Sequence, residues 1–580
     1  MKDTSIEENR IGYAGMHDII TIENYNRTLK KQEKVEEINN IYMSKPEDFD
    51  ATKYKMKLLQ GPHDEREGFA LFPLGLGYIA RIVHEMGIDV SVIDAHAEKL
   101  NINETIAKTL NQEYNVLGIT ALSTQYDFVK KITKRIKEVK KEVIIILGGQ
   151  LAHYNSHTVI ENTGVDICVI GEGEITIQEI FYNFNSLGKV KGIAFRGEGG
   201  EYIKNESQKR IKNLDIVPLP YYDIFNMEYY MSNGFYGARV KKAINVLSSR
   251  GCPYSCTFCS LSFPNVTYRS VDNVIEEIKY LQKRFGIDGL SFCDELFVIN
   301  KKRVLEFCEK IKPLNIRWGG QARANIVNDD VDFLLKMKDA GAVYIGYGLE
   351  SATSDMLSSM QKKTTVEQNI KCMEAAQEAG MVVVAQYMFG FPGETLESIA
   401  AGIDYFDKVK YVPPIGPDSP AHISITIPLP GSQLYEDCKK NGLIINEDKY
   451  LEKISIGYME SKNIIVNLTK FTDEELLQLK QYAEQKMMEN YVNNMYNMDK
   501  YWRIKNIIRK VKEIYFYEGG VSLLIKLLNR ILMIAKIYAQ RKININDIMQ
   551  LVRNKNNKKQ DYIYRSEVTR DMDKILAKFK

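Results

Sequence analysis

The chain of 580 residues is poor in cysteine and has no long apolar run. Its eight cysteines are too few and too scattered for the disulfide framework of a small secreted domain. Residues 1–9 are polar and charged, and no window reaches about 18 uninterrupted apolar residues. We therefore expect neither a signal peptide nor a transmembrane helix, and we expect a cytoplasmic protein in a reducing compartment.

Several common catalytic and nucleotide-binding motifs are also absent. The chain has no G-x4-G-K-[ST] loop for phosphates, no H-E-x-x-H zinc motif and no G-x-S-x-G nucleophile turn. Gly75 and Gly77 begin a dinucleotide-binding pattern, but Ala80 stands where that pattern requires its third glycine. These absences exclude P-loop, zinc-protease and serine-hydrolase chemistry and argue against a NAD site.

The net charge of +3 conceals an uneven distribution. Residues 501–580 carry 19 basic and 7 acidic side chains, a local net charge of +12, whereas the first 500 residues carry 59 basic and 68 acidic side chains, or −9. A basic region on an acidic body can bind an anionic partner such as a lipid surface, an acidic leader peptide or nucleic acid. A solvated helical surface explains the same charges more simply, so we expect no nucleic-acid partner.

Within this basic region, residues 521–538 have an apolar stripe with interspersed lysine and arginine, the pattern of an amphipathic helix. Such a helix either packs against the rest of the protein, which is the commoner arrangement, or makes a peripheral contact with a membrane. Both alternatives stay open at the level of the sequence.

Apolar and helical periodicity divides the chain into five regions. We predict an α/β protein whose regions are an N-terminal extension (1–54), a doubly wound, Rossmann-like domain (55–185), a linker and small subdomain (186–240), a partial (β/α)6 TIM-like barrel (241–440) and a basic helical C-terminal region (441–580). The expected strands of the first domain are Asp89–Ile93, Val116–Thr120, Val143–Leu147 and Ile167–Ile170. A helix is predicted to open near Pro73 and to end at Met86, before Gly87.

Glycine, small and acidic residues follow the strands of the first domain. In a doubly wound sheet the loops at the carboxyl ends of the strands bind the ligand, and glycine lets a ligand approach the backbone closely. The candidate ligand-binding residues of this domain are Gly75, Gly77, Asp94, Ser123, Thr124, Gly148, Gly149, Gly171, Glu172, Gly173 and Glu174.

The second domain alternates strands and amphipathic helices six times. The expected strands are Ile244–Leu247, Gly289–Phe292, Ile316–Gly319, Tyr344–Leu349, Val382–Met388 and Ile423–Ile427. The helices between them include Val271–Phe285 and Val366–Ala379. By analogy with complete barrels, the loops at the carboxyl ends of these strands should hold the chemistry.

Three of the cysteines lie in one short loop after the first strand of this barrel. Cys252, Cys256 and Cys259 have the spacing C-x3-C-x2-C, and three thiolates on one short loop can bind three corners of an iron-sulfur cube. The loop has no fourth cysteine, whereas structural zinc sites usually have four ligands. A cube with three protein ligands leaves one iron open to a small molecule. We predict that the remaining cysteines are small buried hydrophobic residues: Cys168, Cys293, Cys308, Cys372 and Cys438.

This loop, with Phe258 directly before its last cysteine, resembles the radical S-adenosylmethionine (SAM) superfamily. The resemblance implies a 4Fe-4S cluster on the three cysteines, whose open iron binds SAM, and cleavage of SAM to a 5′-deoxyadenosyl radical. It also implies oxygen sensitivity, anaerobic operation and an external flavodoxin- or ferredoxin-like electron donor. The SAM contacts that the resemblance implies are Phe258, Asp294, Glu295, Arg323, Glu350, Ser351, Gly390, Pro392 and Gly393.

The first domain resembles the cobalamin-binding domain that precedes the barrel in one large class of these enzymes. This implies cobalamin at the strand-end residues named above. Cobalamin carriers of another class bind cobalt through the histidine of a D-x-H-x-x-G loop. Asp94 and His96 begin that pattern, but Lys99 stands where glycine is required, and His63 also lies outside any match. We therefore interpret His96 as a surface or loop histidine. The missing motif fits two alternatives, a cobalt site without a histidine ligand and a domain that has lost cobalamin, and both stay open at the level of the sequence.

The two resemblances together imply an enzyme that methylates an unactivated carbon or phosphorus centre of a small-molecule or peptide substrate. An alternative with the same cofactors is a cyclisation or rearrangement without methyl transfer, as in the oxidative ring closure of tetrapyrroles. A second alternative, from a different class, is a non-catalytic cobalamin or cluster sensor whose effector is the basic C-terminal region.

Overall fold

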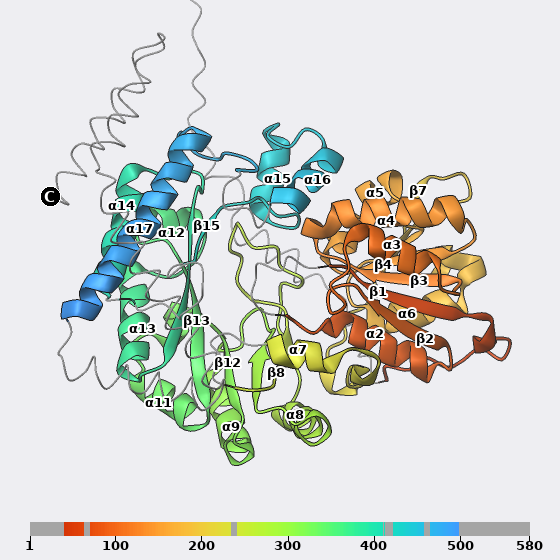
Figure 1. Cartoon of the computed structure of the whole chain (residues 1–580), viewed down its shortest axis with the longest axis horizontal. Helices are drawn as coiled ribbons and strands as arrows, with labels where there is room; N and C mark the ends of the chain where they lie inside the picture. Colours follow the sequence, from red (N-terminus) through yellow and green to blue (C-terminus); the bar gives the residue numbers. More distant parts are fainter. Residues whose placement is uncertain are drawn as a thin grey trace, which may run out of the picture.

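The computed structural model describes residues 40–62, 70–233, 240–409, 411, 422–457 and 464–497. These residues form two α/β domains that lie beside each other, and residues 433–457 lie above their junction (Figure 1). The predicted α/β architecture is confirmed. His63 and the amphipathic segment 521–538 lie outside the described residues. No helix in the described ranges is long and apolar enough to cross a bilayer.

The first domain contains one seven-stranded sheet in the order β2-β1-β3-β4-β5-β6-β7. Five strands are parallel and the last two are antiparallel: β1 (Lys55–Gln60), β2 (Asp89–Asp94), β3 (Val116–Thr120), β4 (Ile144–Gly148), β5 (Ile167–Val169), β6 (Ile193–Arg196) and β7 (Tyr202–Lys204). The four strands predicted for this domain agree with β2 to β5 to within one residue at each end.

Two parts of this sheet differ from the sequence prediction. Residues 193–204 were expected in a linker, whereas they form the β6–β7 hairpin that extends the sheet; β7 has only three residues and little apolar pattern. The sequence does not predict the first strand, β1, because Lys55 and Lys57 interrupt its apolar run. Lys57 is nevertheless buried, and its Nζ donates to Ser91 Oγ on β2 at 2.5 Å, so its aliphatic stem packs within the sheet.

Helices cover both faces of the first sheet. They are α2 (Leu74–Glu85), α3 (Ile102–Leu110), α4 (Tyr126–Val139), α5 (Gln150–Asn162) and α6 (Gly173–Tyr182). Residues of α2 and α6 pack in one core with Leu58, and residues of α4 and α5 pack in another with Leu59, the next residue of β1. The alternation of side chains along a strand produces this division. Helix α2 ends as predicted, because Gly87 takes a φ of +82° beyond the cap.

The second domain is an open barrel of six parallel strands in the order β15-β14-β13-β12-β11-β8. The strands are β8 (Ala243–Val246), β11 (Gly289–Phe292), β12 (Arg317–Ala322), β13 (Ala342–Glu350), β14 (Val382–Phe389) and β15 (His422–Ile425), and a short hairpin is formed by β9 (Ser249–Arg250) and β10 (Thr267–Tyr268). The helices are α8 (Val271–Phe285), α9 (Lys301–Ile311), α10 (Ala324–Val327), α11 (Val331–Asp339), α12 (Ser354–Ser359), α13 (Val366–Glu378) and α14 (Leu396–Lys408). The predicted partial barrel is thus confirmed.

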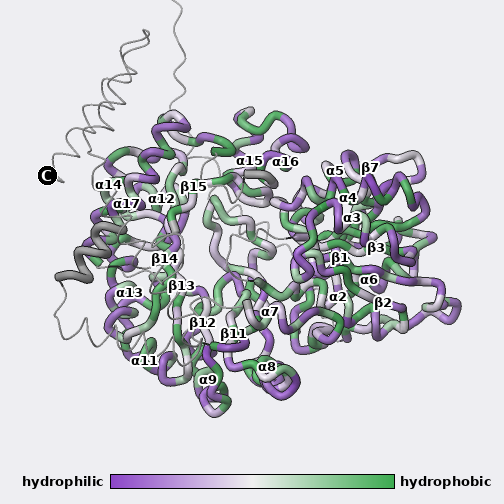
Figure 2. Tube along the Cα trace, in the orientation of Figure 1, coloured by the Kyte–Doolittle hydropathy of each residue, from purple (hydrophilic) through white to green (hydrophobic). Residues whose placement is uncertain are grey.

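An aromatic cluster stabilises the first half of the barrel. The indole of Trp318 is fully buried, its Nε1 donates to Ala340 O at 2.8 Å, and its ring lies edge-on to those of Phe307 and Phe297 at 5.2 and 5.6 Å. The barrel strands are largely hydrophobic, as Figure 2 shows, whereas outer helices such as α8 and α9 alternate hydrophobic and hydrophilic residues.

The connector (residues 205–242) and the C-terminal segment (residues 433–497) join the two domains. The connector includes α7 (Met227–Asn233), and the C-terminal helices are α15 (Gln433–Lys440), α16 (Glu447–Gly457) and α17 (Asp473–Asn497). Helix α16 docks on the first domain, where Lys130 Nζ lies 2.6 Å from Asp448 Oδ1 and 2.9 Å from Glu452 Oε1. Helix α15 docks on the barrel, where Leu434 N donates to Thr257 O at 2.9 Å. The segment is therefore a strap across both domains.

Candidate functional site

The cysteine loop lies at the carboxyl end of β8, between the strands of the β9–β10 hairpin. Cys252 and Cys256 are buried and Cys259 is partly exposed. Cys252 N donates to Phe263 O and Cys259 N donates to Cys256 O, both at 3.1 Å, so the loop is closed by its own backbone. The structure therefore brings the three predicted cluster ligands together on one folded loop.

Gly251, directly before the first of these cysteines, fixes the entry to the loop. Its φ is +94°, and a Cβ atom there would lie 2.3 Å from Asn265 O, so only glycine fits without strain. Its N–H donates to Glu295 Oε2 at 2.9 Å. Glu295, predicted as a SAM contact, is therefore also a support of the loop.

Asp294, another predicted SAM contact, holds the chain just before the loop. Its carboxylate accepts hydrogen bonds from Ser248 N at 2.7 Å, Ser248 Oγ at 2.6 Å and Ser249 Oγ at 2.5 Å. Burial raises the pKa of Asp294, and these hydrogen bonds oppose the rise. Both acidic residues after β11 thus bind the protein's own loop, and their contact with SAM stays a prediction.

Two buried cations lie beside the cysteines. Arg323, at the end of β12, directs Nη1 to Cys256 Sγ at 3.5 Å, stacks on the ring of Tyr254 at 3.6 Å, and donates through Nη2 to the backbone carbonyl of Lys362. The Nζ of Lys362 lies 5.7 Å from the centre of the Phe258 ring. Phe258, Arg323 and the loop are therefore held as one unit.

A hydrogen bond between two of the cysteines, together with the nearby cations, shifts their pKa values. The hydrogen bond from the Cys259 thiol, followed by the charges of Lys362 and Arg323, lowers the pKa of Cys256 to about 6, although burial opposes the shift. The pKa of Cys259 is raised, because its thiol donates this hydrogen bond and is itself buried. Burial likewise raises the pKa of Cys252. The thiolate is the form that binds iron, and the charges of Arg323 and Lys362 beside the loop fit an anionic 4Fe-4S cluster. Within the described ranges no three His, Cys, Asp or Glu side chains are arranged to hold a single metal ion.

Lys362 was not predicted from the sequence, because it stands in an ordinary polar stretch. Its Nζ lies 2.7 Å from Glu350 Oε1 at the end of β13, and each side chain is only 7% exposed. A Cβ atom on Gly348 would come within 2.4 Å of Glu350 Oε1 and 2.7 Å of Lys362 Nζ, so this glycine makes room for the pair. Ser351 is buried next to Glu350, and the contact of both residues with SAM stays a prediction.

The turn after β14 brings the remaining predicted SAM residues to the same edge of the barrel. Gly390 and Gly393 have φ of +84° and +89°, and they enclose Pro392. Gly390 N donates to Glu394 Oε2 at 3.2 Å. Phe391, in the same turn, meets the ring of Phe258 edge-on at 6.5 Å. The turn is thus packed against the cysteine loop.

The carboxyl edge of the first sheet has the features of a ligand site. Leu71 and Leu122, in the loops after β1 and β3, are each 43% exposed, although most large apolar side chains are buried. Gln60 Oε1 and Asn155 Nδ2 are buried at this edge, and neither has a hydrogen-bond partner among the residues that the structure describes. A Cβ on Gly171 would meet no atom within 4 Å. Open space, exposed apolar carbon and unpaired polar groups fit a large ring with a polar nucleotide tail such as cobalamin.

The other residues predicted for this edge divide into two groups. The glycines at positions 75 and 148, together with Thr124, border the open edge, and Ser123 Oγ donates to Asn155 Oδ1 at 3.2 Å. Gly149 and Gly77 are structural, because a Cβ on Gly149 would lie 2.6 Å from Ala121 O and one on Gly77 would lie 2.8 Å from a side-chain atom of Pro220.

Asp94 and His96 turn toward α7. Asp94 Oδ2 accepts from Tyr230 OH at 2.7 Å and Oδ1 accepts from Ala97 N at 3.0 Å. His96 lies in the turn after β2, as predicted, but it is buried and not on the surface, because Tyr229 of α7 covers it with Tyr229 OH 3.4 Å from its Nε2. The cobalt site without histidine stays a prediction.

Glu172 and Glu174, at the end of β5, face the barrel. Both carboxylates bind the guanidinium of Arg250 in β9. A Cβ on Gly173 between them would lie 2.9 Å from Ile79 Cδ1 of α2, so the loop is packed on its other side. Sequence position placed these residues at the correct edge but did not identify their partner.

The cysteines outside the loop agree with prediction in four cases. Cys168, Cys308, Cys372 and Cys438 are buried. Cys293 is partly exposed and not buried as predicted, because it follows β11 at the open edge. Although the residue as a whole is partly exposed, its thiol is largely desolvated, which raises the pKa of Cys293 to about 12.

Comparison with known proteins agrees with this geometry. The B12 binding domain family matches residues 67–181, and the Radical SAM superfamily matches residues 246–406. The structure of the cobalamin-dependent S-adenosylmethionine radical enzyme OxsB, with aqua-cobalamin and S-adenosylmethionine bound, superposes with a TM-score of 0.59 at 17% identity, covering 89% of this chain and 83% of that chain. At this identity the likeness shows the fold.

Similar sequences extend across both domains. An uncharacterized methyltransferase of Pyrococcus horikoshii is 31% identical over 419 residues, which cover 70% of this chain and 85% of the relative. Cytidylyl-2-hydroxyethylphosphonate methyltransferase of Streptomyces wedmorensis is 25% identical, with coverages of 70% and 84%. Anaerobic magnesium-protoporphyrin IX monomethyl ester cyclase of Rubrivivax gelatinosus is 26% identical, with coverages of 65% and 68%.

The fold and the site therefore define an enzyme that joins a cobalamin-binding domain to a radical SAM barrel. The predicted cofactors, a 4Fe-4S cluster, SAM and cobalamin, agree with this class. The chain belongs to the family of cobalamin-binding radical SAM enzymes.

Proposed function

We propose that the protein transfers a methyl group from SAM to an unactivated carbon or phosphorus centre of a small molecule or peptide. The observation that carries the proposal is that the ligand edge of the first domain abuts the cysteine loop. Tyr154 of α5 donates through its hydroxyl to Leu261 O in that loop, and the ring of His153 lies 6.4 Å from the ring of Phe263. A ligand at this edge would therefore lie next to the mouth of the barrel.

The residues of the barrel have separate roles in this proposal. Cys252, Cys256 and Cys259 would hold three irons of the cluster, and Arg323 and Lys362 would stabilise the negative charge on sulfur. When bound, the cluster and SAM supply a 5′-deoxyadenosyl radical, and cobalamin supplies the methyl group.

The surrounding residues hold this arrangement in place. Asp294 and Glu295 fix the entrance of the loop through hydrogen bonds to Ser248, Ser249 and Gly251. The apolar cluster of Phe258, Met360, Phe391 and Leu434 packs beside the loop and excludes water from it.

Methyl transfer is favoured over ring closure because two of the relatives named above are methyltransferases and one of these is the most identical of the three. The cyclase relative makes cyclisation without methyl transfer the second candidate. Cytoplasmic location, anaerobic operation and a flavodoxin- or ferredoxin-like electron donor belong to the same proposal. No part of it requires nucleic acid or a membrane.

The proposal is tested first by cofactor content and then by the fate of labelled methyl groups. After anaerobic purification and reconstitution with iron, sulfide and hydroxocobalamin, we expect about four irons and one cobalt per chain. Reduced protein incubated with methyl-labelled SAM should carry label on the recovered cobalamin. Full loading with deoxyadenosine formation and no labelled cobalamin would favour cyclisation instead, and iron without cobalt would contradict both candidates.

A further inference from the structure

One arginine joins the cobalamin-binding domain to the cysteine loop. Arg250, in β9, directs Nη1 to Glu172 Oε1 at 2.9 Å and Nη2 to Glu174 Oε1 at 2.5 Å. The three side chains are 13%, 4% and 5% exposed. The ring of Tyr78 in α2 lies 5.5 Å from the guanidinium carbon. Each nitrogen of the planar fork thus holds a different carboxylate of the first domain, which fixes the direction as well as the distance of the contact.

A second arginine extends the connection to the far end of the loop. Glu172 Oε2 accepts from Ile211 N at 2.7 Å and lies 4.0 Å from Arg210 Nε in the connector. Arg210 Nη1 donates to Asn265 O at 2.8 Å, and its guanidinium stacks on the ring of Phe263 at 4.1 Å. Glu172 is therefore linked to both ends of the cysteine loop, through Arg250 before it and through Arg210 after it.

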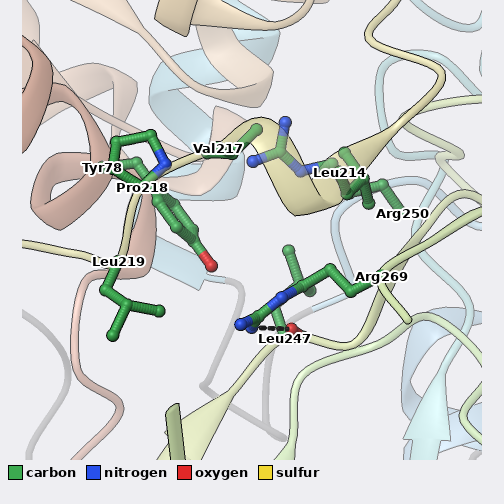
Figure 3. Close-up of a pocket in the computed structure, with 8 residues that line it drawn as sticks. All are labelled: Tyr78, Leu214, Val217, Pro218, Leu219, Leu247, Arg250 and Arg269. Carbon is green, nitrogen blue, oxygen red and sulfur yellow. Dashed lines mark hydrogen bonds between the residues drawn. The ribbon is translucent and has the colours of Figure 1, made fainter. Parts of the chain in front are cut away.

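A small cavity adjoins this bridge. A cavity of about 10 Å³, room for about one water molecule, lies where α2, the connector and the barrel meet. Figure 3 shows the hydroxyl of Tyr78 directed into this cavity toward the guanidinium of Arg269, which donates to Leu247 O at 2.8 Å. The residues that line the cavity are Tyr78, Leu214, Val217, Pro218, Leu219, Leu247, Arg250 and Arg269.

A buried ionic cluster adds little net stability compared with apolar residues of the same volume, so its presence needs another explanation. A guanidinium that binds two carboxylates allows only one relative orientation of the two domains, whereas an apolar contact would allow several orientations. The residue after Arg250 is Gly251, and Cys252 follows directly. A movement of the first domain that keeps the ion pairs intact would therefore pull on the chain two positions before the first cluster ligand.

We propose that Arg250, held by Glu172 and Glu174, is a positioning residue that fixes the cobalamin-binding domain against the cysteine loop and so sets the separation between corrin and cluster. The inference rests on the proposed function, because it requires both cofactors in one chain. It assigns the two carboxylates to domain geometry and not to direct contact with cobalamin.

The separation is measurable by pulsed electron paramagnetic resonance between cob(II)alamin and the reduced cluster in the full-length holoenzyme. Two variants are compared with the wild type. Arg250→Lys keeps the charge but loses the fork. The triple variant Arg250→Met, Glu172→Gln, Glu174→Met removes the charges together, while the new amide oxygen at position 172 would still accept from Ile211 N. The matched control, Glu161→Gln with Glu206→Gln, neutralises two carboxylates with side chains 53% and 81% exposed.

We expect one narrow distance distribution in the wild type and the control. Both bridge variants should load iron and cobalt but give a broader or displaced distribution, and the triple variant should do so at a thermal midpoint close to that of the wild type. A changed distance distribution at an unchanged thermal midpoint would show that Arg250 positions the domain and does not merely stabilise the fold. An unchanged narrow distribution in both loaded variants would overturn the inference.

A cofactor-free measurement keeps the test independent of the proposed function. Hydrogen exchange of the peptide covering residues 249–263 should be faster in Arg250→Lys than in the control, even in apoprotein. Equal exchange in the two would contradict the bridge itself. Failure of the wild type to bind cobalt, with faster exchange in the variant, would overturn the proposed function but leave the bridge between domain and loop supported.

Discussion

The buried pair of Lys362 and Glu350 allows a quantitative test of the site. Its two charges lie 2.7 Å apart, and each side chain is 7% exposed. In Lys362→Met the carboxylate of Glu350 stays buried without its partner, a loss of about 3 to 5 kcal/mol. With about 2 to 4 °C per kcal/mol for a domain of this size, the barrel should unfold about 6 to 20 °C lower.

The assay uses Trp318, which is fully buried in the barrel. The chain has two tryptophans, so all variants carry Trp502→Phe and the fluorescence transition then reports the barrel alone. Lys363→Met is the matched control, since Lys363 is the neighbouring lysine and is exposed. We expect it to change stability by less than about 0.5 kcal/mol.

A double variant separates the charge from the packing. Glu350→Gln combined with Lys362→Met leaves no unpaired charge, so it should recover most of the stability that Lys362→Met loses. The reasoning is refuted if the single variant melts within about 2 °C of the wild type, or if the double variant is as unstable as the single one.

Three further outcomes follow from the site. Alanine at Cys252, Cys256 or Cys259 should abolish the visible absorbance of the cluster and SAM cleavage together; cleavage by the triple alanine variant would contradict the assignment. Asp294→Ala removes the acceptor of three hydrogen bonds before the loop and should lose most of the iron but keep cobalamin, as metal analysis would show. Burial raises the pKa of Glu394 to about 7 from 4.5, so the folded state binds this proton more tightly and its contribution to stability falls, by about 3 kcal/mol, as pH rises from 4.5 to above 7. The thermal midpoint should therefore decrease more between pH 5 and pH 8 in the wild type than in Glu394→Gln, and an equal decrease in the two proteins would contradict the raised pKa of Glu394.

Much of the fold was readable from the sequence because parallel strands buried on both faces are continuous apolar runs. β11 (Gly289–Phe292) and α8 (Val271–Phe285) agree with the predicted bounds residue for residue. The sequence does not predict β1, because it cannot distinguish a lysine whose aliphatic stem packs in the sheet, such as Lys57, from a lysine on the surface. Short antiparallel strands such as β7 contain too few residues to show the alternation of apolar and polar residues that identifies a strand.

The chemistry was readable only where it lies within one short segment. The C-x3-C-x2-C loop is recognisable because its ligands are neighbours in sequence. Lys362 comes from a turn about one hundred residues later, where its charge acts on Cys256, and nothing in the sequence distinguishes it there from Lys363. Contacts that close only in three dimensions leave no local pattern.

The carboxylates after β5 also show that the partner of a side chain cannot be predicted from sequence when it lies in another domain. An acidic loop at the carboxyl edge of a doubly wound sheet is where a ligand is expected, and both Glu172 and Glu174 do lie at that edge. Their partner is Arg250, more than seventy residues later in a different domain. A carboxylate pair offers the same acceptors to a cofactor hydroxyl as to a guanidinium, so composition cannot decide between them. The position of the second domain determines which partner the carboxylates bind, because Arg250 of the barrel occupies their acceptors. The apolar surface of Leu71 and Leu122 and the buried polar groups of Gln60 and Asn155 then remain at the same edge for the cobalamin ligand.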